Sequence, residues 1–176
     1  MKLTFNLWLF VVSSLFATVA SANEQIQYSS DTYLQQQYQM LKVSFLDLEV
    51  TKQTDQVVKI VIPTAYGFRS GGAQLNRMMK DKLKKLAHFL NSYPETTIEV
   101  AGHTDNVGSP ASNIQLGEKR ATAVANVLLD NKVHPFRVRA YSEGEEVPKC
   151  NNNNVQGRAC NRRVELLIAL ERNLAF

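Results

Sequence analysis

A glycine-containing loop and the helix after it carry the residue types best placed to bind a charged ligand. The loop reads Gly102-His103-Thr104-Asp105-Asn106-Val107-Gly108, and Arg120 lies on a helix predicted over 112–130. Asp105 follows a predicted strand, and open α/β sheets commonly bind ligands at the carboxyl ends of their strands. A guanidinium can take a carboxylate in two parallel hydrogen bonds while Asp105 takes an ammonium. Spacing alone favours equally a zwitterion site and an internal ion pair that pins the loop to the helix.

The sequence supports a set of catalytic residues less strongly than it supports this binding site. His103 is the only histidine with a carboxylate close in sequence, and no Ser or Cys stands in a nucleophile-elbow context. Glu143, Glu145 and Glu146 share one loop, whereas a glycosidase acid and base normally face each other across the substrate. We therefore expect a non-enzymatic protein that uses no cofactor.

The two cysteines, Cys150 and Cys160, bracket a predicted loop rich in turn-forming residues. In an oxidising compartment this spacing favours a disulfide, which would stabilise the fold by ~2–3 kcal/mol on the loop-entropy model. A metal site is the alternative, but two thiolates with no histidine or second cysteine pair nearby are too few ligands. The sequence predicts a disulfide and no metal site, provided that the chain is exported.

Export is predicted by residues 1–22. Lys2 precedes an apolar run, and Ala20-Ser21-Ala22 supplies the small residues that a signal peptidase accepts. The run is shorter than the ~20 residues of a membrane span and is interrupted by hydroxyl side chains. A cleaved signal peptide is favoured over a retained anchor, and this places the mature chain in the periplasm.

The charge of the mature chain gives little support for a polyanionic partner. Because Lys2 is the only charged residue of the leader, 19 basic and 16 acidic groups remain, a net charge of +3. The basic cluster of Lys80, Lys82, Lys84 and Lys85 is interpreted as the solvated face of a helix. Nucleic acid binding would need a concentrated basic patch with groove-reading or aromatic elements, so no nucleic acid partner is expected.

The pattern of apolar residues predicts one domain over 46–171 after an N-terminal extension over 23–45. The extension has Leu34, Tyr38, Leu41 and Phe45 at helical spacing, although a loosely ordered tail fits as well. Alternation from Leu46 predicts a strand. Further strands are predicted over 57–62, 97–101, 137–141 and 163–169, and helices over 75–90 and 112–130. Strands separated by such helices predict an α/β fold, a two-layer sandwich of order β-α-β-α-β-β with an added N-terminal strand.

Three segments, in this order, resemble the OmpA-like domain. They are Phe68-Arg69-Ser70-Gly71, the loop 102–108 with the helix segment Asn113-Ile114-Gln115-Leu116-Gly117-Glu118-Lys119-Arg120-Ala121, and Asn161-Arg162-Arg163-Val164-Glu165. The helix segment is particularly similar to the peptidoglycan-associated lipoprotein branch. The resemblance runs from about residue 57 to 170.

This resemblance implies a β-α-β-α-β-β domain that holds meso-diaminopimelate of the peptidoglycan stem peptide without cutting it. The loop Asp and helix Arg of the family correspond to Asp105 and Arg120. The other expected pocket residues are Thr104, Asn113, Leu116 and Arg163, with Phe68 and Ser70 at the mouth.

The sequence departs from the family at Ser112, where many relatives have Tyr, and in Ala140-Tyr141-Ser142-Glu143-Gly144-Glu145, where we expect no ligand. Two other functions compete with simple wall binding. One is an accessory role in an envelope machine, with residues 23–45 docking a protein partner. The other is a wall hydrolase, which would release muropeptides from sacculi. The expected location is the cell wall, peripheral to the outer membrane.

Overall fold

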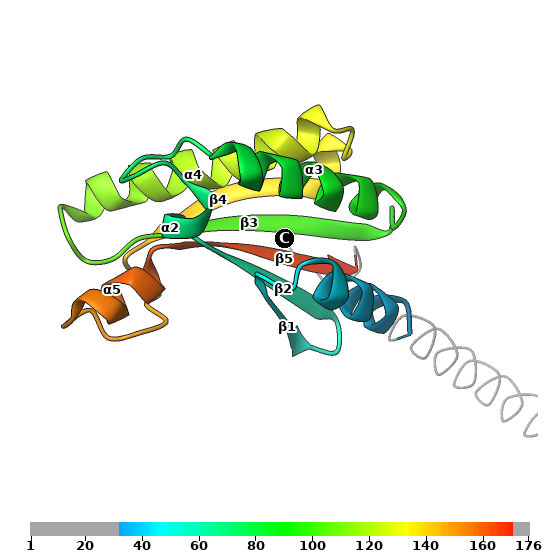
Figure 1. Ribbon diagram of the computed structural model, residues 1–176, viewed down its shortest axis with the longest axis horizontal. Helices are drawn as coiled ribbons and strands as arrows, with labels where there is room; N and C mark the ends of the chain where they lie inside the picture. The colour runs from blue at the N-terminus through cyan, green and yellow to red at the C-terminus, as the bar shows by residue number, and fades with distance from the viewer. Residues whose placement is uncertain (1–31, 171–176) are drawn as a thin grey trace, which may run out of the picture.

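A five-stranded mixed sheet forms one layer of the protein, and its two long helices cover one face of that sheet (Figure 1). The computed structural model describes residues 32–170, so the predicted leader over 1–22 lies outside the described residues. The strands are β1 (Glu49–Thr54), β2 (Val57–Pro63), β3 (Thr96–His103), β4 (Val138–Gly144) and β5 (Arg163–Leu170). The helices are 32–44, α2 (Thr64–Gly67), α3 (Arg77–Asn91), α4 (Pro110–Asp130), the 3-10 helix η1 (Pro135–Arg137) and α5 (Val155–Asn161).

The strands lie in the order β1-β2-β5-β3-β4. β3 and β4 are parallel, and α4 makes the crossover between them, whereas β5 is antiparallel to both β2 and β3. The predicted fold class and the core order β-α-β-α-β-β are confirmed, and the added N-terminal strand is the edge strand β1. The carboxyl ends of β3 and β4 therefore lie side by side at one end of the sheet.

The core lies between the sheet and the helices. Because side chains alternate along a strand, every second residue of β2, β5 and β3 faces the helices. From α3, Met79, Leu83, Leu86 and Leu90 meet them at helical spacing. The buried strand residues on this face are Val58, Ile60, Ile62, Val164, Leu166, Ile168, Ile98 and Val100.

α4 approaches β3 closely at the end that carries the functional residues. A Cβ on Gly102 would collide with the backbone of Gly117, and a Cβ on Gly117 would collide with the hydroxyl of Ser142. The two glycines therefore let helix and strand backbones touch. Their contact fixes the first half of α4, which holds Asn113 and Arg120, against the loop after β3.

Residues 32–44 form a helix that packs on the domain. Leu34 and Leu41 are fully buried, and Leu41 and Phe45 belong to the same apolar core as the sheet. Tyr33 meets the ring of Tyr93 edge-on, with centroids 5.5 Å apart, beyond the end of α3. Within residues 32–170, none of the helices is both long and apolar enough to cross a membrane.

Several predicted boundaries are wrong for identifiable reasons. Leu46 does not begin a strand: it lies in a turn with 83% of its surface exposed, and β1 starts at Glu49. β4 starts at Val138 because Pro135 begins a 3-10 turn, and the guanidinium of Arg137 donates to the carbonyl oxygens of Thr96 and Leu90. The segment between the cysteines, expected to be a loop, contains α5.

Candidate functional site

A cavity of about 350 Å³ opens where β2 ends and β5 begins, between the α2 segment with the turn after it and α4. One wall is the turn after α2, where Arg69 N donates to the carbonyl oxygen of Gln74 and Gly72 N to that of Arg69. Phe68 and Ser70 lie in the lining, as the sequence predicts, and so does Arg120. The full lining is Thr64, Ala65, Phe68, Arg69, Ser70, Gly71, Gly72, Arg120 and Arg162.

Arg120 is buried, and one of its three guanidinium nitrogens makes no hydrogen bond. Its Nε donates to the carbonyl oxygen of Gly72 (3.0 Å) and its Nη2 to that of Gly71 (3.4 Å). Its Nη1 is buried and has no hydrogen-bond partner among the described residues. Burial lowers the pKa of this guanidinium, and nearby Arg162 lowers it further. An unpaired buried donor is costly, so an acceptor supplied by a ligand would be strongly favoured.

Asp105 forms its ion pair with Arg162 and not with Arg120. Arg162 Nη1 lies 2.6 Å from Asp105 Oδ2, and Val107 N donates to Asp105 Oδ1 (3.2 Å). An ion pair between Asp105 and Arg120, one alternative raised by the sequence, is not formed in the described chain. Each carboxylate oxygen can accept another hydrogen bond, so Asp105 retains capacity for a cation.

The electrostatics of the cavity favour an anionic group. Arg69, Arg120 and Arg162 line it, and Asp105 is the carboxylate that contacts this lining. Three positive charges against one negative leave a local excess of +2. The ring of Phe68 lies 6.0 Å from the Arg120 guanidinium carbon and supplies an apolar wall.

Thr104 and Asn113 hold the loop instead of lining the cavity. Thr104 N donates to the carbonyl oxygen of Gly144 (2.8 Å), which ties the loop to the end of β4. The amide of Asn113 donates to the backbone carbonyl oxygen of Asp105 (3.2 Å) and to the carboxylate of Glu145. Leu116 is half-buried on α4 and is not part of the lining.

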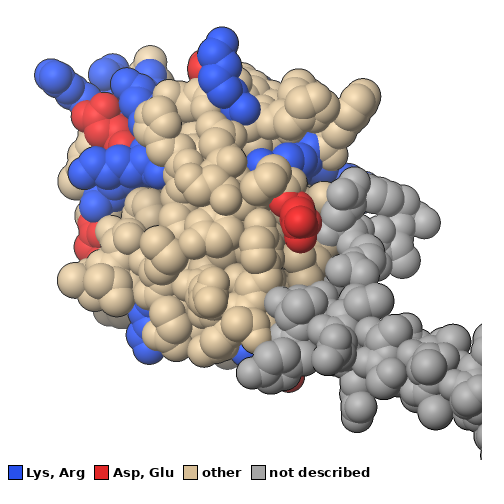
Figure 2. Space-filling view, turned by 90° about the vertical axis from the view of Figure 1, so that its right-hand side faces the viewer, with Lys and Arg blue, Asp and Glu red and all other residues tan. Residues whose placement is uncertain are grey.

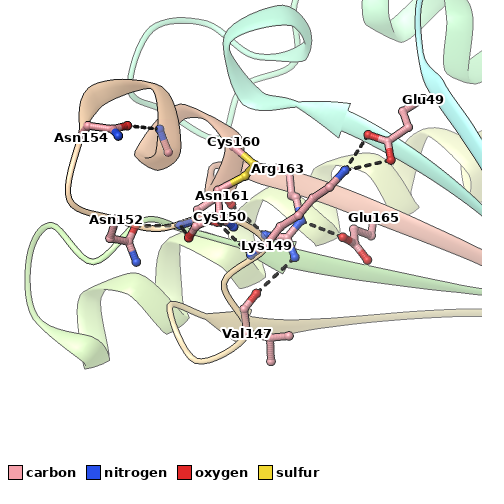
Figure 3. Close-up of a disulfide and its surroundings, with 11 residues drawn as sticks. Glu49, Val147, Lys149, Cys150, Asn152, Asn154, Cys160, Asn161, Arg163 and Glu165 are labelled. Atoms are coloured by element: carbon pink, nitrogen blue, oxygen red, sulfur yellow. Dashed lines mark hydrogen bonds and ion pairs between the residues drawn. A yellow bond between two sulfur atoms is a disulfide. The ribbon is translucent and has the colours of Figure 1, made fainter.

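Arg163, predicted to line the pocket, faces away from it. As the first residue of β5 it pairs with His103 of β3, and both side chains lie on the sheet face opposite α3 and α4. There its Nε donates to Glu165 (2.7 Å), and its other two nitrogens donate to the carbonyl oxygens of Asn161 and Val147 (both 3.2 Å) (Figure 3). Arg162, one residue earlier, reaches the cavity in its place.

His103 lies in the same cluster on that face. Neither ring nitrogen has a hydrogen-bond partner within the described residues, and the side chain is buried. Burial lowers the pKa of His103 to about 4, with a further contribution from the positive charge of Arg163. The pKa of Glu165 is lowered because the hydrogen bond and charge of Arg163 outweigh its burial. This histidine is neutral at pH 7 and contacts no part of the cavity lining.

The predicted disulfide joins Cys150 to Cys160, with Cα atoms 6.1 Å apart. Next to it, buried Asn161 accepts hydrogen bonds from the backbone N–H groups of Lys149 and Cys150 and donates to the carbonyl oxygen of Cys150 (Figure 3). Lys149 also reaches Glu49 of β1 at 2.7 Å. These links fix the chain immediately before Arg162 and thereby place its side chain beside Asp105.

Sequence reasoning missed Arg69 and Arg162, which line the cavity, and the contact of Glu145 with Asn113. The adjacent pair Arg162-Arg163 contained a usable signal, because residues that neighbour each other at a strand's start cannot face the same way. No local sequence pattern predicts the contact between Glu145 and Asn113, because it depends on how the turn after β4 packs on α4.

Comparison with known proteins gives consistent matches. The profile of the OmpA family matches residues 67–162. Outer membrane porin F of Pseudomonas fluorescens is 40% identical over 110 residues, which are 62% of this chain and 33% of the porin, so the match spans about a third of that relative.

Two solved structures share the fold. The peptidoglycan-associated lipoprotein of Burkholderia pseudomallei has 31% identity and a TM-score of 0.54, over 57% of this chain and 86% of that one. The cell wall anchor of the T6SS from Pseudomonas aeruginosa has 25% identity and a TM-score of 0.65, over 74% and 97%. With the family profile covering more than half of its residues, the chain belongs to the OmpA family.

Proposed function

We propose that this chain binds peptidoglycan non-covalently, in the periplasm of a Gram-negative bacterium, by gripping the meso-diaminopimelate of the stem peptide. The observation that carries the proposal is the unpaired, buried Nη1 of Arg120, a residue that lines a cavity with an excess of positive charge. Relatives named as a peptidoglycan-associated lipoprotein and as a cell wall anchor support the same ligand class.

The free end of diaminopimelate carries a carboxylate and an ammonium on one carbon. In the proposed complex, the carboxylate accepts from Arg120 Nη1 and from the nitrogens of Arg162 that Asp105 does not engage. The ammonium donates to the lone pairs of Asp105 that are free of Arg162 and Val107. Arg162 thus orients Asp105 and contributes a second guanidinium.

The test is co-sedimentation of the mature chain with purified sacculi, with melting temperatures measured on the same samples. Asp105→Ala and Arg120→Ala should each lose most binding, because removing one member of a buried charge contact typically costs ~2–5 kcal/mol. Arg120→Lys should also bind poorly, since an ammonium cannot replace the planar fork.

Arg139→Ala is the matched control, because it removes an exposed guanidinium that pairs with Glu99 at 3.8 Å on the far sheet face. It should bind like wild type. If the Asp105 and Arg120 alanine variants stay folded and still sediment with sacculi like wild type, the proposed site is wrong. Release of muropeptides during the incubation would instead indicate a hydrolase.

A further inference from the structure

The helix 32–44 and α3 form a seam on the outer surface of the helix layer. At one end, the hydroxyl of Tyr93 donates to the sulfur of Met40 (3.0 Å). At the other end, Asp47 forms an ion pair with Lys82 of α3 at 2.8 Å. The turn that follows the helix, with Leu46, is therefore held against the first half of α3.

Positive charge is concentrated on the exposed surface of α3 that borders this seam. Five basic residues of α3 stand against Asp81 and Asp47, a local charge of +3 that equals the net charge of the whole mature chain. Lys82 and Lys84 pair with those two carboxylates. The remaining three basic residues form no ion pair with any described residue: Arg77, Lys80 and Lys85. In Figure 2, Lys and Arg side chains gather at the upper left, toward the helix layer.

Large apolar side chains project from the same seam. The exposed fractions are 83% for Leu46, 70% for Val43 and 45% for Met78. Met78 also borders a shallow hollow of about 550 Å³ with Arg77, Asp81, Lys82 and Lys85. Exposed apolar side chains close in sequence to unpaired cations give this surface an amphipathic character.

The combination fits a lipid surface better than a protein partner. Protein interfaces concentrate their binding energy in buried aromatic or arginine anchors that fit complementary pockets. This seam offers projecting aliphatic and thioether side chains with long lysines, which suit a fluid surface of anionic headgroups above acyl chains. We infer that the seam is a docking surface for anionic phospholipid, which would hold the domain at a membrane while its cavity faces the wall.

The direct test is co-sedimentation of the mature chain with vesicles of phosphatidylglycerol mixed into phosphatidylcholine, compared with phosphatidylcholine alone. Binding should require phosphatidylglycerol and weaken as salt is added. Each basic residue near an anionic surface contributes about fivefold, so the triple variant Arg77→Gln, Lys80→Gln, Lys85→Gln should bind on the order of 100-fold more weakly. Leu46→Ser with Val43→Ser should reduce the binding that remains at high salt.

The matched control is Lys119→Gln, Lys132→Gln, Arg139→Gln, which removes the same charge from exposed positions outside the seam. It should retain vesicle binding within a few-fold of wild type, because these positions lie outside the proposed docking surface, whereas a loss caused by net charge alone would be the same in both triple variants. Equal losses in the two triple variants, or no binding to phosphatidylglycerol vesicles, would overturn the inference. So would a photo-crosslinker at position 78 that captures a protein instead of lipid in cells. Sacculus binding, measured in parallel, reports separately on the cavity.

Discussion

Two buried arginines near the same end of the sheet differ in how many of their nitrogens are hydrogen-bonded within the protein. All three guanidinium nitrogens of Arg163 donate hydrogen bonds, to Glu165, Asn161 and Val147. Arg120 is equally buried and lines a cavity, yet its Nη1 is left without a partner among the described residues. A guanidinium whose nitrogens all make hydrogen bonds within the protein stabilises the fold around it. A guanidinium with an unpaired nitrogen can still donate hydrogen bonds to a ligand.

We therefore expect Arg163 to contribute mainly to stability and Arg120 mainly to binding. The largest predicted effect is the loss of stability on substitution of Arg163. Arg163→Ala should lower the free energy of unfolding by ~3–5 kcal/mol, because Glu165 would stay buried without its main partner. Arg120→Ala should lower it by only ~1–2 kcal/mol, the contribution of two hydrogen bonds. Urea unfolding of both variants checks the comparison, and an equal loss of stability would remove the distinction.

The cluster around Arg163 also predicts a pH dependence of stability. The pKa of His103 falls from 6.5 to about 4 on folding, so the unfolded chain binds the proton more readily. The stability from the neutral ring is therefore complete above pH 6.5 and is lost as pH falls toward 4, by up to about 3 kcal/mol. His103→Gln should flatten this slope in urea unfolding from pH 7 to 4. An unchanged slope would mean that other groups cause it.

Removing the disulfide should lower the stability of the fold and also weaken ligand binding through Arg162. Cys150→Ser with Cys160→Ser should cost ~2–3 kcal/mol of stability on the loop-entropy model. Because the bridge and Asn161 fix the chain before Arg162, sacculus binding should also weaken while the fold persists. Thiol titration of the wild-type protein, isolated from cells without reducing agent, should find no free thiol, and two reactive thiols would contradict the account.

The smallest predicted effect concerns Arg162, which is one-third exposed. Arg162→Ala should weaken sacculus binding roughly tenfold, since a charged hydrogen bond of ~1.5–3 kcal/mol is reduced by solvent at a partly exposed site. Arg162→Lys should recover part of the loss by keeping a cation near Asp105. Binding equal to wild type in the alanine variant would limit the site to Asp105 and Arg120.

The sheet and the long helices could be predicted because their apolar residues repeat with clear periods. The core strands around Ile60, Val100 and Leu166 and the helices bearing Leu83 and Val124 were all located from such repeats. The start of β1 was misplaced because Leu46 continues the alternation while its side chain points into solvent. Periodicity reports which residues are apolar and cannot report which of them become buried.

Of the residues that the family resemblance implies, Phe68, Ser70 and Arg120 lie together in the cavity lining. Arg163 lies on the opposite face of the sheet, because the alternation of side chains along β5 turns it away from the cavity, and Arg162 lines the cavity instead. The pairing of Asp105 with Arg162 joins residues 57 positions apart and follows from the loop that the disulfide closes. Contacts of this kind depend on tertiary structure and leave no local pattern.

The most direct test of the central claim is calorimetric titration of the mature chain with two synthetic stem peptides. One is L-Ala-D-Glu-meso-diaminopimelate, and the other has lysine in place of diaminopimelate, which removes only the carboxylate of the side-chain head. If Arg120 Nη1 receives that carboxylate, the first peptide should bind and the second should bind at least 30-fold more weakly, from the ~2–5 kcal/mol cost of losing a buried charged partner. Equal affinity for the two peptides would contradict the account.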